Sequence, residues 1–501
     1  MSLAAILGVC LVAAITLGVG AFGLRISRTT SDFYVASRSV GARTNAAAIS
    51  GEYLSAASFL GIAGLVAVRG ADMLWYPIGW TAGYLLLLMF VAAPLRRSRA
   101  YTLADFTEFR LESQAARGVA SWLVVLIAVL YLIPQFRGAG LTLSTLTGAP
   151  EWVGSGVVAV VVLLNVVVGG MRSITLVQAV QYWLKLAALL IPLAVLLAIG
   201  GGGTSGAHQR LTQTSWLEPM QGPYSEYLTY SLIAALFLGA MGLPHVVVRF
   251  YTNKDGAAAR RTTLSVLVLL SIFYVLPPLY GVLGRRWLPN VHNTDAIVLS
   301  LPSAMAHGVG GDILTGILAA GAFAAFLSTA SGLVLSVAGV LGQDLLSRRF
   351  APVTAFRASA IVAAIGTLIL TLATTQVAVA RGVELAFAVA ASTFCPLLLL
   401  GIWWRRLTAV GAIAGLTVGT LLSSSAVVAA MAGWTLSGAA GAVLVQPALV
   451  TVPTAFLVMI GVSLATPRGV PAGIGRIMVR LHVPEEISLD RGDFSPRGSE
   501  S

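Results

Sequence analysis

Charged residues are scarce in this chain of 501 residues. They make up 10% of the sequence, whereas hydrophobic residues make up 57%, and a soluble domain carries about 25% charged residues. A single water-soluble core cannot hide so much apolar surface, which is driven out of water wherever it can be. The composition therefore excludes a soluble enzyme, a nucleic-acid-binding protein and a disordered chain, and it indicates a protein that crosses a membrane many times.

Cysteine and the common catalytic motifs are also scarce. The two cysteines, Cys10 and Cys395, both fall in apolar stretches, so no disulfide framework, metal cluster or catalytic thiol is readable. The sequence contains no phosphate-binding loop with Lys and Ser or Thr, no zinc-protease helix and no nucleophile elbow. We therefore expect a transporter rather than an enzyme, with neither nucleotides nor nucleic acids among its partners.

Long apolar runs dominate what is present. Crossing a bilayer takes about 20 residues, and thirteen runs reach that scale, at 3–23, 44–68, 72–95, 117–147, 152–169, 172–199, 225–244, 262–284, 312–345, 354–374, 383–404, 408–432 and 441–465. The pattern predicts an all-α polytopic membrane protein with its transmembrane domain at 1–466. The segment 467–501, with Pro, Gly, Ser and mixed charge, is expected to be a disordered tail.

The basic residues predict the orientation. With alternating loops, 24 of the 31 Lys and Arg residues fall on one side of the membrane and five on the other. Short loops rich in Lys and Arg stay in the cytoplasm. We therefore expect a multi-pass protein of the cytoplasmic membrane, with the N-terminus outside and the C-terminus inside. The first apolar run has no basic segment before it, so we interpret it as a retained helix rather than a signal peptide.

The second run gathers hydroxyl and small residues around an acidic one, Glu52. A charged residue inside a membrane span is costly and is a candidate functional residue by default. A face of small residues for close helix packing would not need Glu52. The pattern therefore favours an unwound segment whose carbonyls point into a cavity. Glu52 is also a candidate for coupling to protons, although its charge depends on neighbours that the sequence does not identify.

The ninth run places two adjacent hydroxyls, Ser328 and Thr329, about one helical turn after Ala325. Neutral oxygen clusters suit hard cations, and a broken helix can supply further carbonyl ligands. The alternative is that both hydroxyls bond back to the preceding turn of their own helix. The residues alone leave both interpretations open.

The fourth run contains Pro134, expected to interrupt its backbone hydrogen bonds, and Arg137 close behind it. Arginine stays charged and binds carboxylates with two parallel hydrogen bonds. Arg137 could therefore bind a substrate carboxylate, pair with Glu52 or another internal acid, or reach an interface. Lys185 in the sixth run could face the same cavity or stabilise the bundle. His245 is interpreted as a helix-end residue at the close of the seventh run.

The chain resembles the sodium:solute symporters. The segments that carry the resemblance are Asp32–Gly41, Tyr101–Phe106, Phe109–Arg110, the hydroxyl pair of the ninth run and Asp344–Leu345. Within the family it is most similar to the cation/acetate and monocarboxylate branch, through Gly51–Gly61, Tyr131–Ile133, Gln135, Gly138–Gly140, Gly242–His245 and Arg249–Phe250. Arg137 departs from that branch, whose members often have an uncharged residue there, so it keeps an anionic substrate plausible and puts plain acetate in doubt.

The resemblance implies the inverted-repeat fold of LeuT-type carriers, with five-span repeats at about 44–199 and 225–404 and peripheral helices around them. It also implies a sodium site between the second and ninth spans. Carried over by position, the ligands are the carbonyls of Gly51, Leu54 and Ala325 and the hydroxyls of Ser328 and Thr329.

On this basis we expect sodium-coupled symport of a small organic anion, a short monocarboxylate such as acetate, propionate or pyruvate. The residues expected to bind the substrate are Arg137, Gln135, Tyr53 and Ser55. Two alternatives stay open within transport: a proton-coupled monocarboxylate symporter that uses Glu52, and a sodium symporter of a neutral sugar or amino acid. A membrane sensor built on a carrier fold would typically append a signalling domain, and the short tail argues against one.

Overall fold

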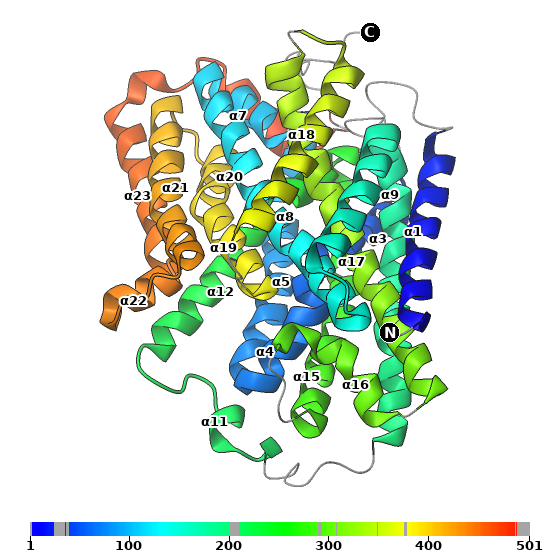
Figure 1. Ribbon diagram of the computed structural model, residues 1–501. Coiled ribbons are helices and arrows are strands. Elements are labelled where there is room, and N and C mark those ends of the chain that lie inside the picture. The colour runs from blue at the N-terminus through cyan, green and yellow to red at the C-terminus, as the bar shows by residue number, and fades with distance from the viewer. Residues whose placement is uncertain are drawn as a thin grey trace.

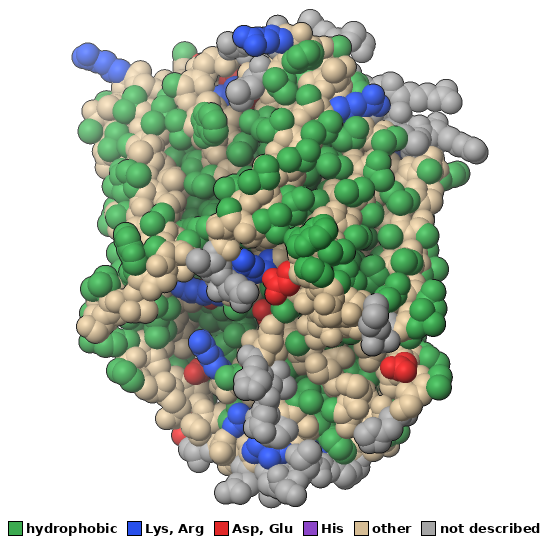
Figure 2. Space-filling model, in the orientation of Figure 1, with side chains coloured by type: hydrophobic (Ala, Val, Ile, Leu, Met, Phe, Trp, Pro, Cys, Tyr) green, Lys and Arg blue, Asp and Glu red, His purple; other side chains and the backbone are tan. Residues whose placement is uncertain are grey.

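The computed structural model describes residues 3–24, 36, 40–200, 210–288, 293–306, 308–347, 349–374, 378–485 and 487, and the regular elements in these ranges are all helical. The long helices run side by side along one direction and form a bundle (Figure 1). Within these ranges, eleven helical segments are long and apolar enough to cross a membrane. Figure 2 shows apolar side chains over most of the visible face, with charged side chains near the two ends and in one group near mid-height.

The helices of the first half are α1 (Leu3–Leu24), α3 (Ala42–Tyr53), α4 (Ile62–Arg69), α5 (Trp75–Leu86), α6 (Ala92–Ser98), α7 (Leu103–Leu111), α8 (Gln114–Thr147), α9 (Glu151–Ile199), α11 (Thr214–Leu217) and α12 (Ser225–Gly242). Those of the second half are α13 (Pro244–Val248), α14 (Gly256–Tyr274), α15 (Leu276–Trp287), α16 (Ile297–Met305), α17 (Val309–Leu341), α18 (Pro352–Ala373), α19 (Val379–Ser392), α20 (Phe394–Trp403), α21 (Ala409–Ala432), α22 (Gly438–Val445), α23 (Ala448–Ala465) and α24 (Ile474–His482). Short π-helical or 3-10 segments join several of them, among them η2 (Ala57–Gly61), η5 (Arg249–Thr252) and η7 (Gly342–Leu346).

Two of the eleven segments, Ala57–Ser98 and Glu151–Ile199, are too long for one crossing. Each contains a glycine in the left-handed region, Gly70 with φ +73° and Gly170 with φ +58°, a conformation that glycine adopts without steric cost. The chain changes direction there, so each segment continues into a second crossing. Divided at these glycines, the described segments reproduce the thirteen predicted spans.

Two spans are interrupted in the middle of the bundle. Helix α3 ends at Tyr53, and the helical path resumes at Ala56, so Leu54 and Ser55 are non-helical. Helix α12 ends at Gly242 and α13 begins at Pro244, with Leu243 extended between them. The expected unwinding of the second span is confirmed. The seventh span, however, does not close at His245, because its apolar helical path continues to Thr252.

Two further expectations about local structure were wrong. Helix α8 is continuous through Pro134, because a spanning helix tolerates proline where neighbouring groups satisfy the freed backbone. The segment expected to be a disordered tail includes α24, whose apolar residues Ile477 and Leu481 are buried. They lie four positions apart and so share one helix face. An apolar pattern this short does not stand out in the sequence. The residues from 488 onward lie outside the described ranges.

Candidate functional site

The break in α3 surrounds the side chain of Lys185, which comes from the second half of α9. The Lys185 Nζ donates hydrogen bonds to the carbonyl oxygens of Gly51 and Leu54, the latter at 2.8 Å, and to the Ser328 Oγ at 2.9 Å. Lys185 and Ser328 are fully buried. The unwound segment thus turns its carbonyls toward an ammonium group supplied by the chain itself.

The hydrogen-bond pattern of Lys185 matches an ammonium ion. Carbonyl oxygens only accept hydrogen bonds, and the Ser328 hydroxyl lies 3.0 Å from the carbonyl of Ala325, to which it can donate. With that donation, all three partners of Lys185 accept. An ammonium ion has the three donors that these three oxygen atoms use.

Next to Lys185 lies a buried ion pair between Glu52 of α3 and Arg249 of η5. The Arg249 Nε lies 2.5 Å from Oε2 of Glu52, and both side chains are 0–1% exposed. Arg249 also donates to Thr175 at 2.8 Å and to Gln178. Close packing makes room for the carboxylate, since a Cβ at Gly332 would lie 1.9 Å from the Glu52 Oε1.

The same residues tie α3 to α17. The Thr329 hydroxyl donates to the backbone carbonyl of Glu52 at 2.6 Å, and Gln178 donates to the carbonyl of Ser328 at 2.8 Å. We refer to the set Glu52, Gln178, Lys185, Arg249, Ser328 and Thr329 as the interior cluster. It contains two cations and one carboxylate. Because Arg249 takes that carboxylate, the hydrogen-bond partners of Lys185 among the described residues are all neutral, and two cations share the single nearby charge of Glu52.

Aromatic rings pack beside the α3 break. Successive rings lie 4.7–6.3 Å apart, centroid to centroid. The members of this aromatic cluster are Tyr53, Trp80, Tyr84, Tyr131, His245, Tyr274 and Phe387. Several of their polar atoms are buried without a hydrogen-bond partner within the described part of the chain: the Nε1 of Trp80, the hydroxyl of Tyr84 and both ring nitrogens of His245. Buried polar groups are normally paired, so these atoms are candidates for binding a polar solute.

Three of the four residues predicted to bind substrate meet here. The Gln135 Oε1 accepts from the backbone N–H of Ala56 at 3.1 Å, just past the break. The Tyr53 hydroxyl donates to the carbonyl of Trp80 at 3.2 Å, and Ser55 is a buried residue of the unwound segment itself. All three lie within two short stretches of the chain that contact each other, and their role in binding substrate stays a prediction.

Arg137 lies elsewhere. It is half-buried, and its Nη2 donates to the carbonyl of Thr374 just after the end of α18, at 2.8 Å. The pairing of Arg137 with Glu52 that the sequence allowed does not occur, because Arg249 occupies that place. Arg137 is only two residues from Gln135, and two positions on a helix point to different sides. The helical geometry of α8 therefore turns Arg137 away from the interior cluster.

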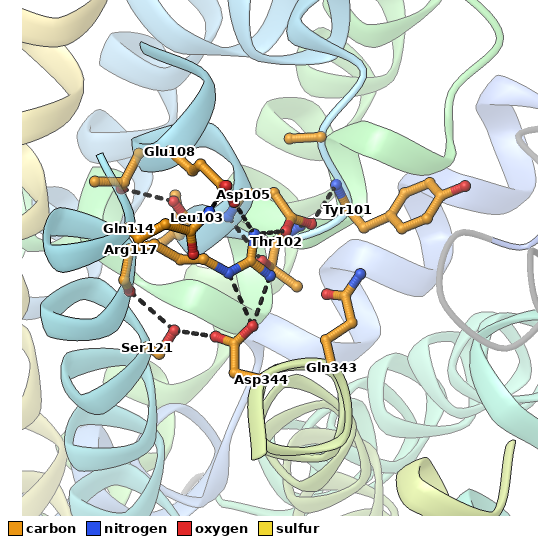
Figure 3. A network of polar contacts seen from close by, with 12 residues as sticks. Tyr101, Thr102, Leu103, Asp105, Glu108, Gln114, Arg117, Ser121, Gln343 and Asp344 are labelled. Atoms are coloured by element: carbon orange, nitrogen blue, oxygen red, sulfur yellow. Dashed lines mark hydrogen bonds and ion pairs between the residues drawn. The ribbon is translucent and has the colours of Figure 1, made fainter. Parts of the chain in front are cut away.

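A second polar network lies at the far end of α17 (Figure 3). Arg117 of α8 contacts Asp105 at 2.7 Å, Glu108 at 2.5 Å and Asp344 at 2.6 Å. Asp105 also accepts from the backbone of Thr102 and so caps α7. Burial raises the pKa of Asp105, and the Arg117 guanidinium opposes that rise. We refer to Asp105, Glu108, Arg117, Ser121 and Asp344 as the helix-end cluster; it ties α7 and α8 to η7.

Sequence reasoning missed two residues of the site, because it places His245 at a helix end and Arg249 in the loop after it. For Lys185 it leaves two roles open, facing the cavity or stabilising the bundle. The available signal was the sequence Gly242-Leu243-Pro244, which marks a break inside the seventh span rather than its end. A polar residue just after such a break lies in the bundle and not in solvent.

With this geometry described, comparison with known proteins gives the family. The family described as the sodium:solute symporter family matches residues 33–419. The chain belongs to the sodium:solute symporter family. It is therefore a solute transporter of the membrane and not an enzyme, as the composition predicted.

Two relatives are similar over nearly their whole length. One is the uncharacterised symporter YwcA of Bacillus subtilis, 33% identical over 480 residues, covering 91% of this chain and 93% of that protein. The other is named a monocarboxylic acid transporter, from Corynebacterium glutamicum, 32% identical over 479 residues and covering 87% of each chain.

Solved structures show the same fold. A substrate-bound, outward-open Na⁺-coupled sialic acid symporter matches with a TM-score of 0.75 at 17% identity, covering 92% of this chain and 97% of that chain. Mhp1, a nucleobase-cation-symport-1 family transporter in a closed conformation, matches with a TM-score of 0.54 at 14% identity, covering 91% of this chain and 99% of that chain. The expected LeuT-like architecture is confirmed.

Proposed function

We propose that the chain is a symporter of a short monocarboxylate, such as acetate, propionate or pyruvate, and that the substrate binds between the two interrupted spans. The observation that carries the proposal is the charge of the interior cluster. Lys185 is a buried cation whose hydrogen-bond partners are all neutral, and the cluster holds two cations against one carboxylate. An isolated buried charge is expensive, and a bound carboxylate beside it would supply the missing negative charge.

The aromatic cluster supports the same substrate class. The Trp80 indole and the Tyr84 hydroxyl offer buried N–H and O–H donors that suit carboxylate oxygens, since hydrogen bonds to charged groups are about twice as strong as neutral ones. The surrounding rings favour a small apolar body. The name of the Corynebacterium relative points to the same class. Gln135, Tyr53 and Ser55 line the break and remain in the proposed site, whereas Arg137 does not.

Family membership supports a cation gradient as the driving force, and the family takes its name from sodium. The proposed cycle is alternating access by movement of the two repeats, at about 44–199 and 225–404, around a site near the middle of the bilayer. The charge of the loops supports an N-terminus outside the cytoplasmic membrane and a C-terminus inside it.

The test is uptake into proteoliposomes of labelled acetate, propionate and pyruvate, with glucose and proline as neutral solutes, under inward sodium or proton gradients. Saturable uptake of at least one acid, and of neither neutral solute, is expected. Trp80→Phe and Tyr84→Phe each remove one donor and should raise the KM by about tenfold or more, since a hydrogen bond to a charged group contributes about 1.5–3 kcal/mol.

The matched controls are Trp122→Phe and Tyr230→Phe, two exposed residues of the bundle surface, which should leave the KM unchanged. Uptake of glucose or proline in place of the acids would establish the neutral-solute alternative. No uptake of any of the three acids would remove the monocarboxylate assignment and leave the family assignment intact.

A further inference from the structure

The family resemblance implies a sodium ion held by carbonyls of the second span and hydroxyls of the ninth. The described residues can be tested for that fit. Three of the implied ligand atoms are the carbonyl oxygens of Gly51 and Leu54 and the hydroxyl of Ser328. All three already accept hydrogen bonds from the Nζ of Lys185. With Lys185 in place, these atoms do not fit a sodium ion.

The other two implied ligands also take part in hydrogen bonds within the protein, and each keeps a lone pair that could face a cation. The Ala325 carbonyl accepts from the Ser328 hydroxyl at 3.0 Å, and the Thr329 hydroxyl donates to the carbonyl of Glu52 at 2.6 Å. The oxygen atoms therefore have the chemistry of a cation site, but each of them already takes part in a hydrogen bond within the protein. The cation at the centre is an ammonium ion that belongs to the chain.

We infer that Lys185 is a built-in cation that takes the place of sodium, so that this chain binds no sodium ion between α3 and α17. A sodium ion there would meet the Lys185 ammonium at contact distance in a buried site, where repulsion between like charges is weakly screened. The lysine is also covalently held, so its charge neither enters nor leaves with the solute.

If Lys185 takes the place of sodium, the group that bridges the break in α3 is a side chain of the protein rather than a bound ion. A bound ion ties α3 to α17 only while it is present, whereas Lys185 belongs to the chain and ties α9, α3 and α17 together whenever they adopt this arrangement. The carboxylate proposed above would then find its positive partner already in position. The inference rests on the family fold and the interior cluster, and it does not depend on which solute is carried.

The test measures sodium binding by the full-length chain in detergent, without substrate. The melting temperature is compared in sodium chloride and in choline chloride of equal ionic strength, together with equilibrium binding of radioactive sodium. The variants are Lys185→Ala, Ser328→Ala and the double variant, and the control is Lys254→Ala, the other lysine of the chain, which is exposed.

We expect Ser328→Ala and Lys254→Ala to leave the sodium response of the wild type unchanged. Lys185→Ala frees the oxygen atoms, so it should gain a sodium site and a sodium-dependent rise of a few degrees in melting temperature, since a ligand that binds only the folded state stabilises it. Ser328→Ala in the same chain should abolish that gain.

Two results would overturn the inference. One is a wild-type sodium response that Ser328→Ala removes, because sodium would then bind beside Lys185. The other is a folded Lys185→Ala variant without any gain in sodium binding. If Lys185→Ala does not fold, the inference is tested by comparing the sodium response of the wild type with that of Ser328→Ala. Because the assay contains no solute, its failure is distinguishable from a failure of carboxylate uptake.

Discussion

Helix α17 and the π-helical segment η7 that follows it each contribute to a polar cluster, and the two clusters have opposite charge balance. The interior cluster, near the middle of α17, has the cations Lys185 and Arg249 against the single carboxylate of Glu52. The helix-end cluster, just beyond the last turn of α17, has the single cation Arg117 against three carboxylates. The two clusters also differ in access to water. In the interior pair the side chains are 0–1% exposed; at the helix end Asp105 and Arg117 are also buried, at 0% and 5%, but Glu108 and Asp344 are 20% and 15% exposed.

The exposure of the side chains to water explains why the charge imbalance has a different consequence in each cluster. Water can solvate the excess negative charge at the helix end, so that cluster is complete and acts as a tie between helices. The excess positive charge at the break of α3 is buried away from water, so an anionic ligand would offset it there. The comparison therefore supports a structural role for the helix-end cluster and the proposed solute binding at the interior cluster.

The largest effect is expected from breaking the interior ion pair. Arg249→Leu leaves the Glu52 carboxylate buried without its partner, and removing one member of a buried pair costs about 3–5 kcal/mol. Thermal unfolding in detergent should show a large fall in melting temperature. Arg261→Leu, an exposed position of α14, is the control and should change it little. A small fall in melting temperature in Arg249→Leu would show that the ion pair contributes little to the stability of the folded state.

The second effect concerns substrate affinity. In sodium-free buffer, Lys185→Ala removes the charge that faces the carboxylate and should raise the KM for uptake by about tenfold or more, since two charges near 4 Å attract by about 4 kcal/mol at an effective dielectric of 20. Sodium added to this variant should enter the freed site and restore part of the affinity. The control is the wild type, with its KM measured in sodium-free buffer and again with sodium added. An unchanged KM in Lys185→Ala would show that the charge of Lys185 does not contribute to substrate binding.

A smaller effect is expected at the helix end. Asp344→Asn removes one of three acidic partners of Arg117 and leaves the other two, so the loss of stability should be about 1 kcal/mol, as for partly exposed pairs. The KM should not change. Asp312→Asn, an exposed residue in the first turn of α17, is the control for loss of an acid from the same spanning segment, Val309–Asp344. A changed KM in Asp344→Asn would contradict the account, because it would show that the helix-end cluster also affects substrate binding.

The smallest effect is expected from Arg137→Ala. Its guanidinium bonds to the carbonyl of Thr374 at the rim of the bundle and lies apart from both clusters, so the KM for the acids should change by less than about twofold. The measurement is the same uptake assay as for Lys185→Ala. A tenfold rise would return Arg137 to the substrate site.

Much of the fold follows from the sequence because its signals are local. Apolar runs of spanning length and their glycines predicted thirteen crossings, and the small residues around Glu52 predicted the break in α3. The site was only partly predictable, because its decisive contacts join distant positions. Lys185 is more than 130 residues from Gly51 and Leu54 in sequence. An arginine near the end of an apolar run also reads as a loop residue, which is how Arg249 was missed.

The central claim is that the cation at the break of α3 is Lys185 itself. The most direct measurement is a pair of cryo-electron microscopy structures of the wild-type chain, one prepared in sodium chloride and one in choline chloride. The account predicts the same Lys185 position in both, with its nitrogen against Gly51, Leu54 and Ser328. A separate ion among those three residues in sodium, with Lys185 turned away, would contradict it.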